Sequence, residues 1–155
     1  MPAITRVGSA LSADATRPRP RTWPAYHRPM AASSLDSSII DRLDAAIEVD
    51  ARTPRSDGTS SSRPIWVVVT DGDAYVRSYR GDSGAWYQRA RADGELTLVV
   101  DGDEIHALAE PVADESVNDR VSDAYRDKYA ERSPGATKTM VNDEVAQTTL
   151  RLGAG

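Results

Sequence analysis

The chain has 155 residues, enough for one ordinary domain, and carries a formal net charge of −5. It contains no cysteine, which excludes disulfides, thiolate metal sites and cysteine nucleophiles. Because the only histidines are His27 and His106, no metal site is predicted. Residues 35–155 hold 14 basic and 23 acidic side chains, and this negative charge argues against nucleic acid and membrane surfaces as partners.

The first 34 residues differ from the rest of the chain in composition. They hold five prolines, five arginines and one aspartate, without a sustained apolar period. This composition predicts a disordered extension at 1–34, followed by one domain at 35–152. A start at Met30 instead of Met1 is the alternative interpretation. The segment lacks the apolar core of a secretory signal, and no apolar run in the chain approaches the ~18 residues of a membrane span, so a cytoplasmic protein is expected.

The elements of the domain are predicted in chain order from the period of the apolar residues. Leu35, Ile39 and Leu43 recur at every fourth residue after Ser34 and predict a short helix. Alternating or continuous apolar runs predict six strands, at 47–52, 65–69, 74–79, 95–101, 104–112 and 147–152. Polar composition predicts loops at 53–64 and 136–144.

Two further helices are predicted between the strands. A short one covers 85–90, and a longer one begins at Asp114 or Ser116 and stops before Pro134-Gly135. The dipeptides Asp71-Gly72 and Asp101-Gly102 predict tight hairpins, which require antiparallel pairing and exclude a doubly wound parallel sheet. Six short antiparallel strands therefore predict a mainly β fold with flanking helices, closed into a small barrel that protects its own edges.

The stretch VRSYRGDSGAWY, at 76–87, gathers cations, small residues and aromatics at the end of a predicted strand. Ser78 points to the core side and Arg77 to the opposite face, and Arg80-Gly81 leaves the sheet before the helix at 85–90. The backbone N–H groups of a helix start bind phosphate well when a hydroxyl and guanidinium groups lie nearby. The predicted phosphate site consists of Arg77, Ser78, Arg80 and the backbone of 81–85, with Arg89 and Arg91 adding to the basic patch.

A simpler interpretation of the same stretch stays open. Arg77 and Arg80 would pair at the surface with local carboxylates such as Asp73 and Asp82. Trp86 and Tyr87 would then only plug the end of the barrel, and no ligand would be needed to explain this cluster.

The late helix and one strand carry further candidates. In DAYRDKY, at 123–129, Tyr125 and Tyr129 belong to the predicted buried stripe, whereas Arg126 and Lys128 project elsewhere, toward the anion site or an interface. The alternative is a packing helix with solvated charges. His106, on the strand at 104–112, is either a surface residue of the barrel or a polar group that lines a pocket.

Three segments together resemble a bacterial domain family of unknown function in the flavin-binding split β-barrel superfamily. They are IWVVVTDGDAYVRSYRGDSGAWYQRA, DAYRDKY and MVNDEVAQTTLRL, and the resemblance covers roughly residues 35–152. It implies a six-stranded antiparallel split β-barrel of the FMN-binding type, usually a homodimer with flavin sites at the subunit interface. The superfamily includes enzymes similar to pyridoxamine-phosphate oxidase and deazaflavin-dependent nitroreductases.

The nitroreductase group offers the more detailed resemblance. Its strand ends in a serine, a basic-Gly turn follows, and a helix begins with Ala-Trp-Tyr against the phosphate tail of the cofactor. Ser78, Arg80-Gly81 and 85–87 match these positions. The sequence departs from the group because His-Pro is absent before Ala85, Arg89-Ala90 replaces Asn-Leu, and the loop is shorter.

The leading hypothesis is a split-barrel protein that binds FMN or deazaflavin and reduces a small molecule. The predicted cofactor-binding residues are Arg77, Ser78, Arg80 and Gly81 at the phosphate, Trp86 and Tyr87 as pocket walls, and Arg126 and Lys128 as secondary candidates. No catalytic residue is assigned. A cofactor-free dimeric binding module is the alternative, and a barrel that binds a small anion, or haem with His106 as axial ligand, is a third hypothesis.

Overall fold

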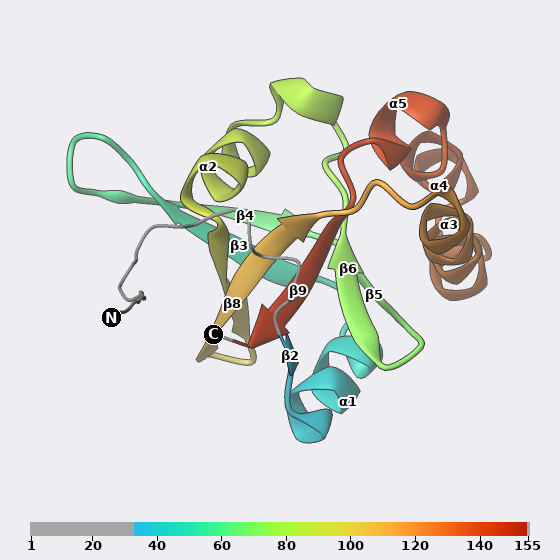
Figure 1. Cartoon of the computed structure of the whole chain (residues 1–155), viewed down its shortest axis with the longest axis horizontal. Coiled ribbons are helices and arrows are strands. Elements are labelled where there is room, and N and C mark those ends of the chain that lie inside the picture. The colour runs from blue at the N-terminus through green and yellow to red at the C-terminus, as the bar shows by residue number, and fades with distance from the viewer. Residues whose placement is uncertain (1–32, 155) are drawn as a thin grey trace, which may run out of the picture. The chain divides into compact units, whose positions relative to one another are not determined.

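The computed structural model describes residues 33–154, which are organised around one antiparallel sheet (Figure 1). Residues 1–32 of the predicted extension at 1–34 lie outside the described residues, and its last two residues, Ser33–Ser34, form a short strand. The strands are β2 (Ser33–Ser34), β3 (Val49–Pro54), β4 (Ser60–Ile65), β5 (Val67–Thr70), β6 (Asp73–Val76), β7 (Glu95–Val100), β8 (Asp103–Pro111) and β9 (Leu150–Ala154). The helices are α1 (Ser37–Ala45), the 3₁₀ turn η3 (Gly81–Ser83), α2 (Ala85–Asp93), α3 (Glu115–Tyr129), α4 (Pro134–Met140) and α5 (Asp143–Ala146).

The order of the strands shows how the sheet closes. The sheet runs β4-β3-β7-β8-β9-β6-β5, and the short β2 pairs with β9. β4 and β5 therefore lie at opposite edges, although only Trp66 separates them in the sequence. A single residue can join the two edges only if the sheet curls until they meet. The predicted mainly β split barrel is confirmed, with two more strands than the six expected from the sequence among the described residues.

Both predicted hairpins form with two-residue turns. β5 and β6 pair from Val67↔Val76 to Thr70↔Asp73, and β7 and β8 end at Val100↔Asp103. The turn residues all have positive φ, at 53° and 80° for Asp71 and Gly72 and at 52° and 83° for Asp101 and Gly102. Positive φ at both central positions defines the type I′ turn, whose twist matches that of the strands.

The predicted loop at 53–64 is wrong, because most of it belongs to a long hairpin. β3 and β4 pair from Val49↔Ile65 to Pro54↔Ser60, and Arg55–Thr59 alone forms the connection. The serines of β4 hide the strand in the sequence, yet an edge strand needs main-chain hydrogen bonds more than apolar side chains. The predicted strand at 65–69 is divided at Trp66, where the chain passes from one edge of the sheet to the other.

The predicted irregular segment at 136–144 is also wrong. Pro134 occupies the first turn of α4, where its missing N–H costs nothing, and the Asn142 side chain caps α5 by accepting from Val145 N at 2.8 Å. The last strand begins at Leu150 instead of 147, because Thr148 and Thr149 lie between α5 and β9 and donate their hydroxyls back to α5. α1 is capped by Asp36, two residues after the expected Ser34.

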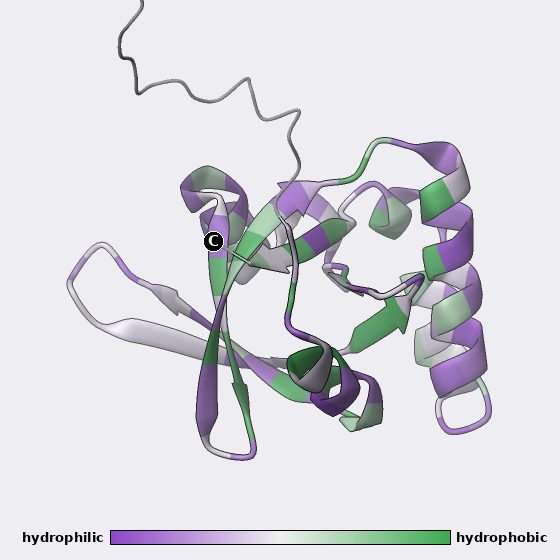
Figure 2. Ribbon diagram, turned by 60° about the horizontal axis from the view of Figure 1, so that its bottom comes forward, coloured by the Kyte–Doolittle hydropathy of each residue, from purple (hydrophilic) through white to green (hydrophobic). Residues whose placement is uncertain are grey.

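The hydrophobic residues form two clusters on the two faces of β5 and β6. Val67 and Val76 face the barrel interior, where they join Leu43, Leu98, Leu150 and Leu152. Val68 and Tyr75 face the opposite way and pack with the buried side of the α3–α5 layer, made of Val121, Tyr125, Tyr129, Met140 and Val145. Figure 2 shows the alternation of hydrophobic and hydrophilic bands along α3. The prediction that strand 65–69 is buried on both faces is thereby confirmed for Val67 and Val68, which are fully buried.

Two kinds of site are not found in the described residues. Within residues 33–154, no helix combines the length and the apolar composition that a membrane crossing requires. The same part of the chain holds no group of three or more His, Asp or Glu side chains placed to bind a metal ion.

Candidate functional site

A cavity of about 570 Å³ opens where β4, the end of β6 and the start of α2 meet. Continuing the β5–β6 register beyond Val67↔Val76 places residue 78 near residue 65, so the strand exit lies beside the inner end of β4. From there the cavity extends along β4, whose Ser61, Arg63 and Ile65 share one face of the strand and all line it. The volume lies within the range of small-molecule sites.

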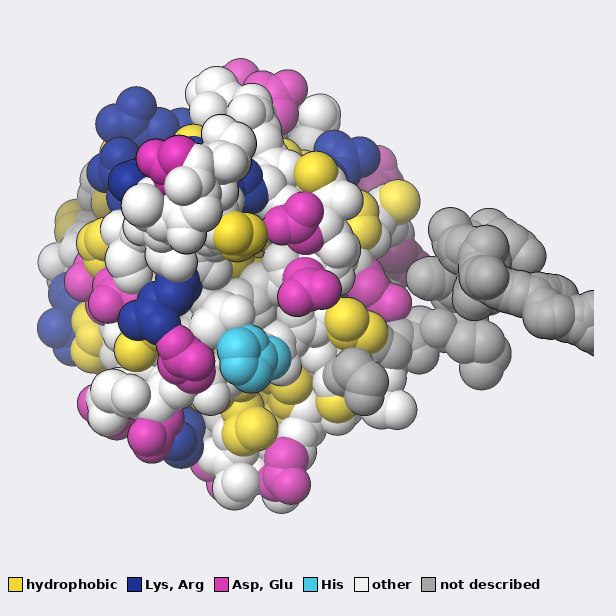
Figure 3. Space-filling view, turned by 90° about the vertical axis from the view of Figure 1, so that its left-hand side faces the viewer, with side chains coloured by type: hydrophobic (Ala, Val, Ile, Leu, Met, Phe, Trp, Pro, Cys, Tyr) yellow, Lys and Arg dark blue, Asp and Glu magenta, His cyan; other side chains and the backbone are white. Residues whose placement is uncertain are grey.

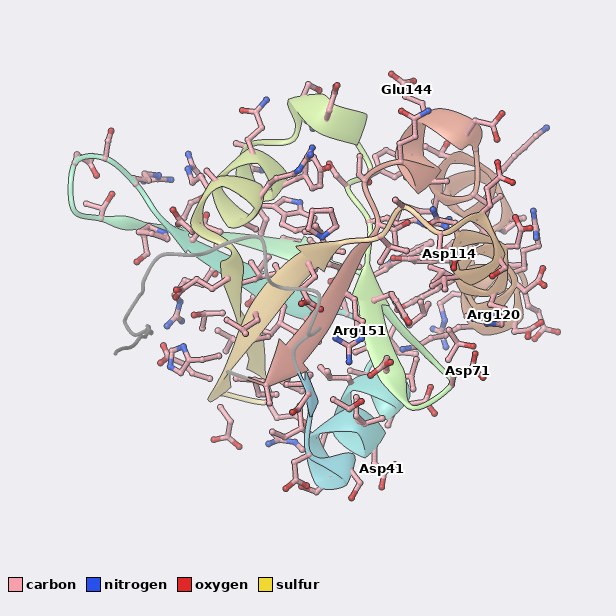
Figure 4. All side chains as sticks on the ribbon, viewed as in Figure 1. Asp41, Asp71, Asp114, Arg120, Glu144 and Arg151 are labelled. Atoms are coloured by element: carbon pink, nitrogen blue, oxygen red, sulfur yellow. The ribbon has the colours of Figure 1, made fainter. Side chains whose placement is uncertain are left out.

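The exit of β6 forms the inner wall of the cavity. Arg77 and Ser78 are buried, at 1% and 0% exposure, and their side chains point to opposite faces as the strand alternation predicts. Gly81 turns the chain, with φ of 67° and its N–H donated to Ser78 O at 2.9 Å. A Cβ at Gly81 would also contact Glu144 of α5, labelled in Figure 4, at 3.7–3.8 Å. Contact at this distance is ordinary, so the positive φ is the reason that glycine is favoured here.

The hydroxyl of Ser78 has no hydrogen-bond partner, although it is buried. Its Oγ lies against Gly84, where an added Cβ would collide with it. Gly84 is the N-cap residue of α2 and offers no side chain to cap the helix. The first helical bond from this end is Gln88 N to Gly84 O at 3.0 Å, so the three preceding N–H groups are not used by the helix. An unpartnered hydroxyl thus lies at an uncapped, electropositive helix start.

Five arginines line the cavity, and Glu48 is the only acidic residue among the described residues that line it. These arginines are Arg55, Arg63, Arg77, Arg80 and Arg89. None of the five forms an ion pair with a carboxylate within residues 33–154. Arg89 instead donates to Thr53 Oγ1 at 3.2 Å and Arg55 to Thr59 Oγ1 at 3.4 Å.

The arginines outside the cavity behave differently. Five of them are paired with carboxylates: Arg42 with Asp103, Arg52 with Glu104, Arg120 with Asp71, Arg126 with Asp123, and Arg151 with Asp73 and Glu110. Figure 4 labels Arg120 beside Asp71, and Arg151 over the sheet. Figure 3 shows that basic side chains gather mostly on one half of the face it presents, whereas acidic ones are spread widely. Within residues 33–154, five of the seven arginines that lack a carboxylate partner therefore line the cavity.

Aromatic side chains complete the walls. Trp66 and Trp86 both line the cavity, and Trp66 is held by stacking on Tyr129 with ring centroids 3.9 Å apart. Tyr79 also lines it and is 56% exposed, which is unusual for a large aromatic residue. Trp66, Tyr79, Arg55 and Arg63 were not among the candidates found from the sequence. The exposed charges of Arg63 on β4 and of Arg55 in the turn before it were the missed signal, because all of 53–64 was assigned to a loop.

The structure brings together some of the predicted site residues but not all. Arg77, Ser78, Arg80 and Trp86 line the cavity. Gly81 shapes the turn without lining it, and Tyr87 is buried edge-to-face against Trp86, at 6.2 Å between ring centroids. Arg91 lies outside as well and donates to Tyr87 Oη at 3.3 Å. The simpler pairing of Arg77 and Arg80 with Asp73 and Asp82 is absent among the described residues, where Asp73 pairs with Arg151.

The two candidates on α3 lie away from the cavity. Arg126 pairs with Asp123 at 2.9 Å on the exposed helix surface. Lys128 donates to Leu43 O at 3.1 Å and Val67 O at 2.7 Å, which ties α3 to the end of α1 and to β5. Burial lowers the pKa of the Lys128 ammonium to about 8, since the charged form is poorly solvated there. The geometry gives both residues structural neighbours instead of a place at the cavity.

His106 lies on β8, opposite Thr97 of β7. Its side chain is 75% exposed, and its Nδ1 is 3.0 Å from Thr97 Oγ1. It does not line the cavity, so the structure places no enclosed pocket around it within the described residues.

Comparison with known sequences identifies the family. The pattern described as "uncharacterized protein conserved in bacteria (DUF2255)" matches residues 39–152, and the chain belongs to this family. The resemblance to a bacterial family of unknown function is thereby confirmed. Curated protein sequences give no match.

Solved structures similar to this one share its fold at low sequence identity. The conserved hypothetical protein Rv2991 from Mycobacterium tuberculosis superposes with a TM-score of 0.56 at 18% identity, covering 78% of this chain and 79% of that one. HutZ, the heme storage protein from Vibrio cholerae, gives a TM-score of 0.57 at 11% identity, covering 79% of this chain and 91% of that one. Likeness at these identities concerns the fold alone.

Proposed function

We propose that the cavity binds a ligand with a phosphate group and a planar ring, FMN or a deazaflavin, and that this DUF2255 member uses it to reduce a small molecule. The observation that carries the proposal is the unpartnered Ser78 hydroxyl at the uncapped start of α2, inside a cavity lined by unpaired arginines. A buried hydroxyl without a partner costs about 1–3 kcal/mol, so its retention calls for an acceptor supplied by a ligand.

The phosphate end of the ligand would lie at Ser78 and α2. The Ser78 hydroxyl would donate to one phosphate oxygen, and the free N–H groups of the first turn of α2 would donate to others. Arg80 and Arg89 line the same region of the cavity and would neutralise the charge with hydrogen bonds strengthened by it. Because Gly84 has no Cβ, the Ser78 hydroxyl can lie directly at the helix start, beside the N–H groups that would bind the phosphate.

The ring end of the ligand would lie among the aromatic residues. Trp66, Tyr79 and Trp86 offer flat apolar surfaces for a planar ring, and aromatic stacking favours this arrangement. The flavin or deazaflavin identity is supported by the sequence resemblance of 76–87 to the phosphate-binding turn of deazaflavin-dependent enzymes. When bound, such a cofactor supplies hydride transfer, and the chain supplies binding, orientation and electrostatics.

The first experiment compares wild type with Ser78→Ala in titrations with FMN and, separately, with inorganic phosphate. We expect wild type to bind FMN, with quenching of tryptophan fluorescence from Trp66 and Trp86, because both line the cavity. Ser78→Ala is expected to weaken FMN binding about tenfold or more, the value of a hydrogen bond to a charged group. It should leave the melting temperature unchanged or higher, since it removes a buried hydroxyl that lacks a partner.

The matched control is Ser62→Ala, on the same strand as Ser61 but exposed and outside the cavity lining. It should bind both ligands as wild type does. Wild-type protein whose melting temperature does not rise at FMN concentrations far above micromolar would contradict the cofactor proposal. Equal FMN affinity in wild type and Ser78→Ala would contradict the assigned phosphate position.

If the protein is instead the cofactor-free dimeric module given as the alternative, the expected binding results are the opposite. This alternative requires a stable homodimer and no binding of FMN, deazaflavin or phosphate. We also propose a homodimer for the cofactor-binding form, on the strength of the sequence resemblance. Light scattering at micromolar concentration, with and without FMN, separates a ligand-free dimer from a ligand-binding one, and a monomer under both conditions contradicts the homodimer.

A further inference from the structure

The guanidinium of Arg77 is the most heavily bonded side chain of the described structure near the cavity. Its Nε donates to Thr149 Oγ1 at 2.8 Å, its Nη1 to Ser122 Oγ at 2.9 Å and Met140 O at 3.0 Å, and its Nη2 to Asn118 O at 2.9 Å. The four acceptors come from α3, the end of α4 and the residue before β9. One side chain of the strand exit thus holds several parts of the α3–α5 layer.

This cation is buried without a counter-ion. It is 1% exposed, no carboxylate in residues 33–154 pairs with it, and it lies 5.4 Å from the centroid of the Tyr125 ring. Burial lowers the pKa of the Arg77 guanidinium because the charged form loses solvation. Neutral acceptors satisfy its hydrogen bonds without cancelling its charge, so a positive field persists at the neighbouring residue.

The residue after Arg77 is held by the threonine next to Thr149. Ser78 N donates to Thr148 Oγ1 at 2.8 Å, directly beside the Arg77–Thr149 contact. Thr148 and Thr149 are fixed in turn, because they donate to Val145 O at 2.6 Å and Ala146 O at 2.7 Å. The Ser78 backbone and the Arg77 side chain are thus fixed on the face toward α3–α5. Because side chains alternate along a strand, the Ser78 hydroxyl lies on the opposite face, against Gly84.

We propose that Arg77 is the positioning residue of the anion site, which fixes Ser78 at the start of α2 and couples anion affinity to the α3–α5 layer. This inference rests on the proposed function, and it changes the role expected from the sequence. Arg77 acts through Ser78 and through its buried charge, whereas direct contact with the phosphate falls to Ser78, Arg80 and α2.

The test compares Arg77→Lys, Arg77→Met and Thr149→Val, with FMN and inorganic phosphate as probes, at a temperature where each variant is folded. Arg77→Met removes both the positive charge and the planar guanidinium group with its hydrogen bonds. We expect it to bind both probes about tenfold more weakly. Arg77→Lys keeps the charge but cannot reach all four acceptors, so its affinity should lie between those of wild type and Arg77→Met. Thr149→Val removes one acceptor and should weaken binding about threefold with the charge intact.

Arg151→Met is the matched control, because Arg151 is also mostly buried but pairs with Asp73 and Glu110 away from the cavity. It should lower the melting temperature and leave both affinities unchanged, which separates positioning from general destabilisation. If Arg77→Met does not fold, Arg77→Lys and Thr149→Val still decide the question.

Wild type that binds the probes while Arg77→Lys and Thr149→Val bind equally well overturns the positioning role and leaves the proposed function intact. Wild type that binds neither FMN nor phosphate overturns both. If Arg151→Met loses as much affinity as the Arg77 variants, the positioning role of Arg77 is overturned, because the loss would then follow protein stability alone.

Discussion

The Ser78 hydroxyl and the Cα of Gly84 are in contact, and this contact defines the inner end of the cavity. Local rules explain why the two residues differ. Ser78 is set by the alternation of β6, whereas Gly84 must lack a side chain because Ser78 occupies that space. The two positions are six residues apart, so the spacing of Ser and Gly in VRSYRGDSGAWY encodes a tertiary contact.

Gly84→Ala is expected to push Ser78 and the start of α2 apart. The added Cβ collides with Ser78 Oγ, and overpacking of this kind costs about 1–3 kcal/mol of unfolding free energy. FMN affinity should fall with it, because the hydroxyl and the helix N–H groups no longer converge. Urea denaturation and FMN titration measure the two effects.

Gly135→Ala is the control for this substitution. Gly135 lies in α4, and a Cβ there meets nothing within 4 Å. The Gly135→Ala protein should bind FMN as wild type does, and its free energy of unfolding should rise by about 0.5–1 kcal/mol, since alanine favours a helix more than glycine does. If Gly84→Ala is as stable as wild type and binds FMN equally well, the contact between Ser78 and Gly84 does not limit which residue can occupy position 84.

At the scale of elements, one side chain of α3 joins three pieces of the fold. Lys128 donates to the carbonyls of Leu43 at the end of α1 and Val67 in β5. Tyr129 lies next to it and donates to Ile47 O at 2.7 Å, and it stacks on Trp66 at the junction of β4 and β5. This junction is where the two edges of the curled sheet meet, so α3 stabilises the closure of the barrel.

Lys128 predicts a dependence of stability on pH. Its pKa is lowered to about 8 in the folded chain, so between pH 8 and the higher pKa of the unfolded chain the unfolded state binds more protons. The free energy of unfolding should therefore rise with pH from about 8 to 10, relative to Lys128→Met. Above pH 10 the free energy of unfolding should fall in both proteins, because both retain Tyr129, whose pKa burial raises to about 12.

Urea denaturation at pH 7, 8, 9 and 10 compares wild type, Lys128→Met and Lys138→Met. Lys138 is the other lysine of the chain and is exposed, so its variant should follow wild type. Parallel pH curves for wild type and Lys128→Met would contradict the lowered pKa. Unchanged FMN affinity in Lys128→Met is expected as well, since Lys128 lies outside the cavity.

Charge is segregated at the scale of the whole molecule. The chain has 24 acidic and 19 basic residues, yet five arginines that have no carboxylate partner within residues 33–154 converge on one cavity. Carboxylates neutralise many of the arginines elsewhere, so the cavity keeps a local positive field on an acidic protein. Such a field attracts anions to the cavity and repels polyanions from the remaining surface.

Salt should therefore weaken ligand binding. We expect the Kd of FMN to rise about threefold or more between roughly 50 and 500 mM NaCl, because exposed charges are screened over this range. Arg63→Gln should reduce this dependence, since Arg63 is exposed and unpaired beside the cavity, with stability changed by less than about 0.5 kcal/mol. A Kd independent of salt would show that Arg63 and the other exposed arginines of the cavity do not act on the ligand.

Local chemistry made part of the fold and the site predictable. The Asp-Gly pairs specify type I′ turns, Val67 and Val68 mark a strand buried on both faces, and the stretch 76–87 places Ser78, Arg80 and Trp86 at one turn. The long helix does end before Pro134, as predicted, but the sequence did not reveal that Pro134 also begins α4, because proline suits the first turn of a helix as well as the position after one.

Residues close together in the chain were enough to predict the antiparallel β class, the turns and the inner corner of the cavity, because these features depend on local contacts. Contacts between distant segments were needed to show that β4 is a strand, that Arg55, Arg63 and Trp66 line the cavity, and that Lys128 does not. The reason is the curl of the sheet, which brings distant strands together and is fixed by packing across the barrel. The same closure leaves Arg77 buried among acceptors from α3, α4 and Thr149, although its neighbours in the sequence suggested a surface cation.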